Sequence, residues 1–191
     1  VVVTAPVSGF SIPEYSELTV AWDATDNIQL SDSVRINYLK NGMTIFTEIF
    51  ENPFTIPAGI TYTARIQVIA LDESGNEGQG YSEFFQVTDN TPPTVEIISP
   101  NSGESQTIGH LATISWSESD NVGIETREFA WTIDDENWTD IFSESIQGST
   151  LSYITPNQPT NAFSIRTIVT DAVGLKDTSI ISGIKILIEY P

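Results

Sequence analysis

The sequence predicts an all-β protein made of two antiparallel β-sandwiches in tandem, each with about seven strands. Three observations support this prediction. The chain repeats itself once, its apolar residues alternate with polar ones over short segments, and turn-forming residues separate these segments. No segment shows a helical period long enough to cover one face of a helix. Short strands separated by turns about every 8–12 residues are typical of β-sandwiches.

The repeat is visible when the sequence is aligned with itself at a shift of 94 residues (116 − 22). The matched pairs include Pro6 and Pro100, Trp22 and Trp116, and Asp26 and Asp120. Further along, the shift becomes 99 residues (171 − 72), and Asp72 then matches Asp171. The second copy therefore carries about five extra residues in its middle, where a loop accommodates an insertion at little entropic cost.

The two copies are predicted to be domains covering residues 1–90 and 91–191. The segment Asp89-Asn90-Thr91-Pro92-Pro93 separates them, and its prolines restrict φ and stiffen the connection. Val1 matches Val95, which follows this segment closely. We therefore expect the chain to begin at the start of a module and to be part of a longer array.

The expected strands follow the same order in both copies. In the first copy they include residues 18–22, 34–38 and 64–70; in the second they include 114–116, 129–133 and 163–169. Trp22 and Trp116 end equivalent alternating strands, which predicts that both belong to the core. Asn41-Gly42 and Ser74-Gly75-Asn76 are typical turn sequences between strands.

Charge and composition exclude several functions. The chain has 7 Lys+Arg against 26 Asp+Glu, a net charge of −19, which argues against binding to nucleic acid or anionic membranes. With no cysteine, the chain has no disulfide, thiolate metal site or cysteine nucleophile. No apolar run approaches the roughly 18–20 residues that direct membrane insertion requires.

Several segments resemble fibronectin type III and bacterial Ig-like modules. Leu18-Thr19-Val20-Ala21-Trp22 is similar to their second strand, and Ala70-Leu71-Asp72-Glu73-Ser74-Gly75-Asn76 resembles their F–G loop. The acidic segment Asp120-Asn121-Val122-Gly123-Ile124 also fits the bacterial Ig-like pattern. The resemblance implies two tandem Ig-like (fibronectin III-like) β-sandwiches from an extracellular or cell-surface protein.

Acidic loops are the strongest candidates for a binding site. In a sandwich of this topology the B–C and F–G loops lie at one end, where their side-chain oxygens could bind calcium. The expected ligands are Asp23, Asp26, Asn27, Asp72 and Asn76 in the first domain, and Asp120, Asn121 and Asp171 with Asp89 and Asn90 in the second. Asp177 is a further candidate there. The alternative is that Asp and Asn serve only as turn formers.

Carbohydrate binding and catalysis have weaker signals. Trp138 is the one tryptophan expected to be exposed and able to stack on a sugar, since Phe129, Trp131 and Ile133 share one strand face. The single histidine, His110, follows Gly109 in an expected turn. Asp134-Asp135 reads as a charged hairpin rather than as a glycosidase pair. We therefore expect no enzyme activity.

The expected function is that of a semi-rigid, calcium-stiffened spacer or adhesive module pair in an extracellular or cell-surface protein. Its partners would be neighbouring Ig-like modules, copies of itself or a polysaccharide. One alternative is an accessory module of a secreted polysaccharide-active enzyme. Another is a subunit of a surface layer or filament, in which the apolar end segments 1–3 and 184–188 pair with neighbouring chains.

Overall fold

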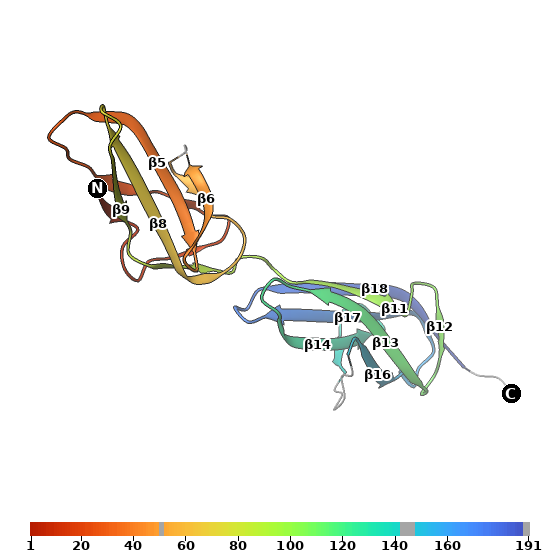
Figure 1. Cartoon of the computed structure of the whole chain (residues 1–191). Coiled ribbons are helices and arrows are strands. Elements are labelled where there is room, and N and C mark those ends of the chain that lie inside the picture. The colour runs from red at the N-terminus through yellow and green to blue at the C-terminus, as the bar shows by residue number, and fades with distance from the viewer. Residues whose placement is uncertain (50–51, 142–147, 189–191) are drawn as a thin grey trace. The chain divides into compact units, whose positions relative to one another are not determined.

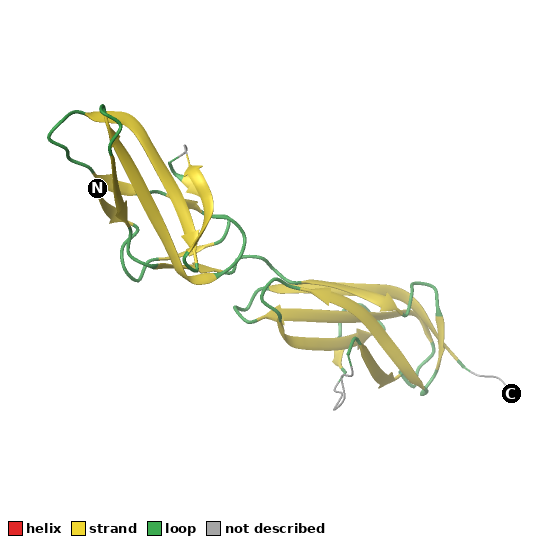
Figure 2. Cartoon of the chain, in the orientation of Figure 1, coloured by secondary structure: helices red, strands yellow, loops and turns green. Residues whose placement is uncertain are grey.

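The computed structural model describes residues 1–49, 52–141 and 148–188, and these residues form strands, turns and loops (Figures 1 and 2). The chain divides into two compact units, Val1–Asn90 and Thr91–Pro191. No helix within the described ranges is long and apolar enough to cross a membrane. The predicted all-β class is confirmed.

The second unit is a sandwich of two sheets. One sheet has the order β11 (Thr94–Ser99), β13 (Leu111–Ser119), β16 (Thr150–Ile154). The other has the order β12 (Ser105–Thr107), β18 (Lys176–Leu187), β17 (Thr160–Asp171), β14 (Ile124–Thr132), β15 (Thr139–Asp140). All pairs are antiparallel except β12 with β18. Both sheets contribute to one buried core, which includes Ile114 and Leu151 from the first and Phe163 and Ile184 from the second.

The first unit repeats this plan with shorter strands on one side. Its larger sheet has the order β2 (Ser11–Pro13), β10 (Phe85–Thr88), β8 (Thr61–Asp72), β5 (Leu30–Lys40), β6 (Met43–Ile49), and β9 (Glu77–Tyr81) also pairs with β8. The facing layer consists of two short ladders. They join β1 (Val2–Ala5) to β4 (Ala21–Asp23) and β3 (Glu17–Leu18) to β7 (Phe54–Thr55).

The strand expected over residues 18–22 is interrupted in the first unit. The backbone N–H of Val20 donates to Asn52 Oδ1, and Asn52 Nδ2 donates to the Val20 carbonyl, both at 2.9 Å. A side-chain amide thus occupies the position of a partner strand and separates β3 from β4. The equivalent strand of the second unit, β13, runs unbroken between β11 and β16.

The predicted alternation of the core strands is confirmed. Ala64, Ile66 and Val68 of β8 are buried, as are Phe163 and Ile165 of β17. Such alternation points every second side chain into the sandwich.

The two equivalent tryptophans differ in burial. Trp116 is fully buried, whereas Trp22 is only half-buried and packs at the periphery of its core. The prediction that Trp22 is a core residue is therefore only partly right. The reason is that β4 has one partner strand, β1, while β13 is flanked on both sides.

The apolar segment at the C-terminal end does not form an open edge over residues 184–187. Residues 185–187 of β18 pair with β12, and Ile184 and Ile186 also pair with Phe163 and Thr160 of β17. At the other end, β1 pairs with β4. The filament alternative drew on the expectation of free strands at both ends, and over residues 184–187 that expectation is wrong because both sides of β18 are already hydrogen-bonded.

Candidate metal centre

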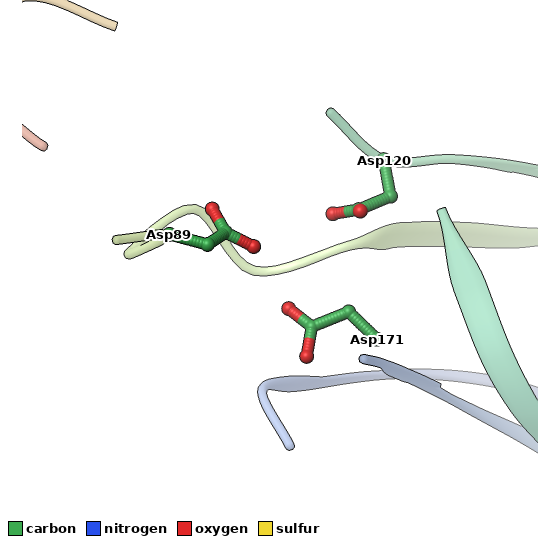
Figure 3. Close-up of side chains that lie close together, drawn as sticks. All are labelled: Asp89, Asp120 and Asp171. Atoms are coloured by element: carbon green, nitrogen blue, oxygen red, sulfur yellow. The ribbon is translucent and has the colours of Figure 1, made fainter. Parts of the chain in front are cut away.

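Three aspartates from separate segments converge in the structure. Carboxylate oxygens of Asp89, Asp120 and Asp171 all lie within 4.8 Å of one another. Figure 3 shows the three side chains pointing toward a common space. Asp89 follows β10 in the segment that leads into β11, Asp120 follows β13, and Asp171 is the last residue of β17.

Local turns fix two of these side chains through hydrogen bonds to one oxygen of each carboxylate. Asp171, which is 0% exposed, accepts hydrogen bonds at Oδ1 from the backbone N–H groups of Val173 (2.9 Å) and Leu175 (2.8 Å). Asp120 Oδ2 accepts from the N–H groups of Val122 (2.8 Å) and Gly123 (2.6 Å). The second oxygens, Asp171 Oδ2 and Asp120 Oδ1, are buried and have no hydrogen-bond partner.

This arrangement is electrostatically unfavourable without a counter-ion. Two like unit charges 4.8 Å apart repel by roughly 3.5 kcal/mol at an effective dielectric constant of about 20. A buried oxygen acceptor that lacks a partner adds a desolvation penalty. A cation bound among the three carboxylates would remove both costs. The oxygen-only donor set is the kind that calcium prefers.

The first unit contains the counterparts of Asp120 and Asp171, and there both oxygens of Asp72, the counterpart of Asp171, are occupied. Asp26 Oδ1 accepts from the N–H of Ile28 at 2.8 Å, in the turn equivalent to that of Asp120. Asp72 accepts from Asn76 at both oxygens: the backbone N–H bonds Oδ1 (2.8 Å) and Nδ2 bonds Oδ2 (2.7 Å). The hydrogen bond from the Asn76 side chain also holds the pKa of Asp72 below its ordinary value.

One residue accounts for this difference between the units. Leu175 occupies the position of Asn76 in the repeat (175 − 76 = 99). The backbone N–H of Leu175 bonds Asp171 Oδ1, just as that of Asn76 bonds Asp72 Oδ1. Leucine has no amide to reach the second oxygen, so Asp171 Oδ2 stays available for a cation. Leu175 was not singled out from the sequence, where an apolar residue in an acidic loop gives no signal of metal binding.

The other predicted aspartate ligands are not members of this group. Asp26, Asp72 and Asn76 line one cavity of about 110 Å³ in the first unit. Asp23 lies in β4 opposite Val2, and Asn27, Asn90 and Asn121 have exposed side chains. Asp177 Oδ2 accepts from the N–H of Val95 at 2.8 Å, so it ties β18 to β11. Across the described ranges, Asp89, Asp120 and Asp171 form the single group of three that meets metal-binding distances.

Asp134, considered as half of a catalytic pair, organises the loop between β14 and β15. Its Oδ1 accepts from Thr132 Oγ1 and from the backbone N–H groups of Glu136 and Asn137, and its Oδ2 accepts from Asn137 Nδ2 at 2.8 Å. The Asn137 side chain is the largest cause of a pKa of Asp134 far below the ordinary value. Asp135 Oδ1 accepts from Ser164 Oγ at 3.0 Å. These bonds fit the hairpin interpretation.

The lowered pKa of Asp134 predicts a pH-dependent contribution to stability. Because the folded pKa lies below the unfolded value of about 3.9, the contribution is fully present above that value and is lost as the pH falls through the folded pKa. Asp134→Ala should therefore be less stable than the parent chain at pH 7, and the gap should narrow below about pH 4. Denaturant unfolding at pH 7, 5 and 3 measures this gap. Glu136→Ala, which removes a neighbouring charge, is the control. A gap that stays constant down to pH 3 would contradict the prediction.

Trp138 is less accessible than expected. Its side chain is half-buried, and the guanidinium carbon of Arg166 lies 4.5 Å from the ring centroid. His110 is exposed and follows Gly109 in a turn, as expected.

Comparisons with known proteins find structural similarity alone. No protein-family model and no curated protein sequence matches the chain. Among solved structures, the fibronectin(III)-like modules of Clostridium thermocellum CbhA are 16% identical, with 98% of this chain and 93% of that chain covered and a TM-score of 0.39. The crystal structure of Rst D1-D2 is 12% identical, with 97% of this chain and 98% of that chain covered and a TM-score of 0.49. A structure of a bacterial ice-binding adhesin is also 12% identical, with 93% of this chain and 60% of that chain covered and a TM-score of 0.37.

The strand order and the shared two-sheet core define the class of each unit as an Ig-like, fibronectin III-like β-sandwich. The chain is a tandem pair of such modules.

Proposed function

We propose that this chain is a non-catalytic structural module pair of an extracellular or cell-surface protein, in which calcium binds Asp89, Asp120 and Asp171. The ion would hold the connecting segment at Asp89 against the loops that follow β13 and β17. Such a restraint limits the freedom of the connecting segment, which is what a semi-rigid spacer requires.

One observation carries the proposal: carboxylate oxygens of Asp89, Asp120 and Asp171 lie within 4.8 Å of one another, and Asp171 Oδ2 and Asp120 Oδ1 are buried without a hydrogen-bond partner. Calcium binds six to eight oxygens at about 2.3–2.6 Å and accepts irregular geometry, so backbone carbonyls and water can complete the set. A turn-forming role explains Asp171 Oδ1 and Asp120 Oδ2, but it does not explain the other oxygen of each.

Two further properties support a structural, non-catalytic role. The net charge of −19 keeps chains mutually repelling and soluble, and it disfavours nucleic acid as a partner. The carboxylates considered for glycosidase chemistry are engaged in holding a hairpin.

Calcium is expected to raise the melting temperature of the second unit. A ligand that binds only the folded state stabilises it by RT ln(1 + [L]/Kd), about 2.7 kcal/mol at a hundredfold excess over Kd. Melting is recorded in EDTA, in calcium and in magnesium, and titration calorimetry counts the ions. We expect one calcium per chain and a smaller effect of magnesium, which requires closer octahedral geometry. Identical melting curves in EDTA and calcium would refute the site.

A matched pair of variants locates the ion. Asp120→Asn keeps the oxygen that accepts from Val122 and Gly123 but removes the charge, so the calcium-induced shift should fall to near zero. Asp26→Asn makes the same change in the equivalent turn of the first unit and should leave the shift unchanged. A loss of the shift in Asp26→Asn, or its retention in Asp120→Asn, would place the ion elsewhere.

A further inference from the structure

The outer face of the larger sheet in the first unit carries a group of aromatic, guanidinium and amide side chains. β5, β8 and β9 lie side by side there (Figure 1). The guanidinium carbon of Arg65 on β8 lies 4.8 Å from the ring centroid of Tyr81 and 4.9 Å from that of Phe84. Both rings remain accessible, since Tyr81 is 39% and Phe84 is 53% exposed. Arg65 Nε donates to the Ser82 carbonyl at 2.7 Å, which holds the guanidinium in place.

A row of amides crosses the same three strands beside these rings. Asn37 Nδ2 on β5 donates to Gln67 Oε1 on β8 at 2.9 Å. Gln67 Nε2 in turn donates to Gln79 Oε1 on β9 at 2.8 Å and to the Tyr81 hydroxyl at 2.9 Å. The row therefore ends at one of the exposed rings. Both N–H groups of the Gln67 amide are used within the row, so Gln67 can only accept from a ligand hydroxyl, whereas the Gln79 amide also carries N–H groups that a hydroxyl can match.

We propose that this face binds a neutral polysaccharide. The apolar face of a pyranose ring would lie on Tyr81 and Phe84, and its hydroxyls would bond the amides of Gln67 and Gln79. Binding sites of this kind combine apolar contact with a few placed polar groups that set orientation. The Arg65 contacts and the amide row hold these side chains in position before binding, which lowers the entropic cost of association.

Charge decides between a neutral and an acidic glycan. The chain carries −19, so an acidic polysaccharide would be repelled over the whole surface. At the face itself, the nearby cation Arg35 is already paired with Glu77. Arg65 is engaged by two rings and a carbonyl, and the groups left to contact a sugar are neutral amides and a phenol.

None of these residues belongs to the calcium site, so this inference does not depend on the proposed function.

The test is affinity electrophoresis of the full chain in gels containing neutral polysaccharides (mixed-linkage β-glucan, xylan, galactomannan) or acidic ones (alginate, pectin). We expect retardation by at least one neutral polymer. Tyr81→Ala should weaken that binding at least about tenfold, because hot-spot aromatics dominate such contacts. Tyr62→Ala is the matched control, since Tyr62 is a 74% exposed tyrosine on the adjacent strand β8, outside these contacts.

Three outcomes would overturn the proposal: no retardation in any neutral gel, stronger retardation in the acidic gels, or unchanged binding of Tyr81→Ala. Loss of binding in Trp138→Ala but not in Tyr81→Ala would likewise overturn it and place the sugar on the second unit. Phe84→Ala provides a second variant on the other ring, and melting curves establish that each variant is folded.

Discussion

Replacing Trp116 with alanine is expected to lower the free energy of unfolding of the second unit by about 3–5 kcal/mol. Trp116 is 1% exposed and its ring centroid lies 4.7 Å from that of Phe129. Its Nε1 also donates to Glu118 Oε2 at 2.9 Å, so the change leaves both a cavity and an acceptor with one partner fewer. Guanidinium unfolding followed by far-UV circular dichroism measures the loss, since Trp22 is the only tryptophan of the first unit and fluorescence could not follow its variant.

The equivalent change in the first unit provides the control. Trp22→Ala should cost clearly less, because Trp22 is half-buried and packs at the edge of its core. Trp116→Phe should fall between the parent chain and Trp116→Ala, since it keeps much of the packing and loses the indole donor. Equal losses for Trp22→Ala and Trp116→Ala would mean that the two positions contribute alike, contrary to their burial.

Replacing Leu175 with asparagine is expected to remove most of the calcium-induced stabilisation, about 2.7 kcal/mol at a hundredfold excess of calcium over Kd. In the first unit Asn76 Nδ2 bonds Asp72 Oδ2 at 2.7 Å, and the new side chain would occupy the same position against Asp171 Oδ2. The oxygen that calcium needs would then have a partner. The variant should therefore melt higher than the parent chain in EDTA and gain less from calcium.

Two variants test this explanation. Leu175→Met keeps an apolar side chain and should retain the calcium response. Asn76→Leu removes the amide from Asp72 and should lower the stability of the first unit in EDTA. A full calcium shift in Leu175→Asn would show that the amide does not compete with the ion, and Asp171 Oδ2 would then not be its ligand.

The core strands could be predicted because their signal is local. Alternation at a period of two places Ala64, Ile66 and Val68 on one face whatever the rest of the chain does. The interruption between β3 and β4 could not be predicted in the same way. It depends on the Asn52 side chain, which lies 32 residues from Val20 in the sequence and takes the place of a partner strand there.

The candidate sites also combine features that are local in the sequence with contacts between distant segments. Aspartates in the expected loops were recognisable by residue type, and Asp89, Asp120 and Asp171 were among them. Residue type did not distinguish these three from Asp23, which is not a member of the group. The rings and amides around Arg65 gave no signal, because their contacts join β5, β8, β9 and the segment before β10.

The sequence by itself determined the all-β class and the faces of the main strands, because repeat spacing and alternation are properties of neighbouring residues. The tertiary structure decided which oxygens can bind an ion. Asp89, Asp120 and Asp171 become neighbours only when three distant segments are brought together. Whether the aspartate after the long strand of each unit keeps a free oxygen then depends on the residue four positions later. In the first unit this residue is Asn76, whose amide bonds Asp72 Oδ2. In the second unit it is Leu175, and Asp171 Oδ2 has no partner. Hydrogen-bond satisfaction is a property of contacts in space, and it separates two loops that look alike as sequence.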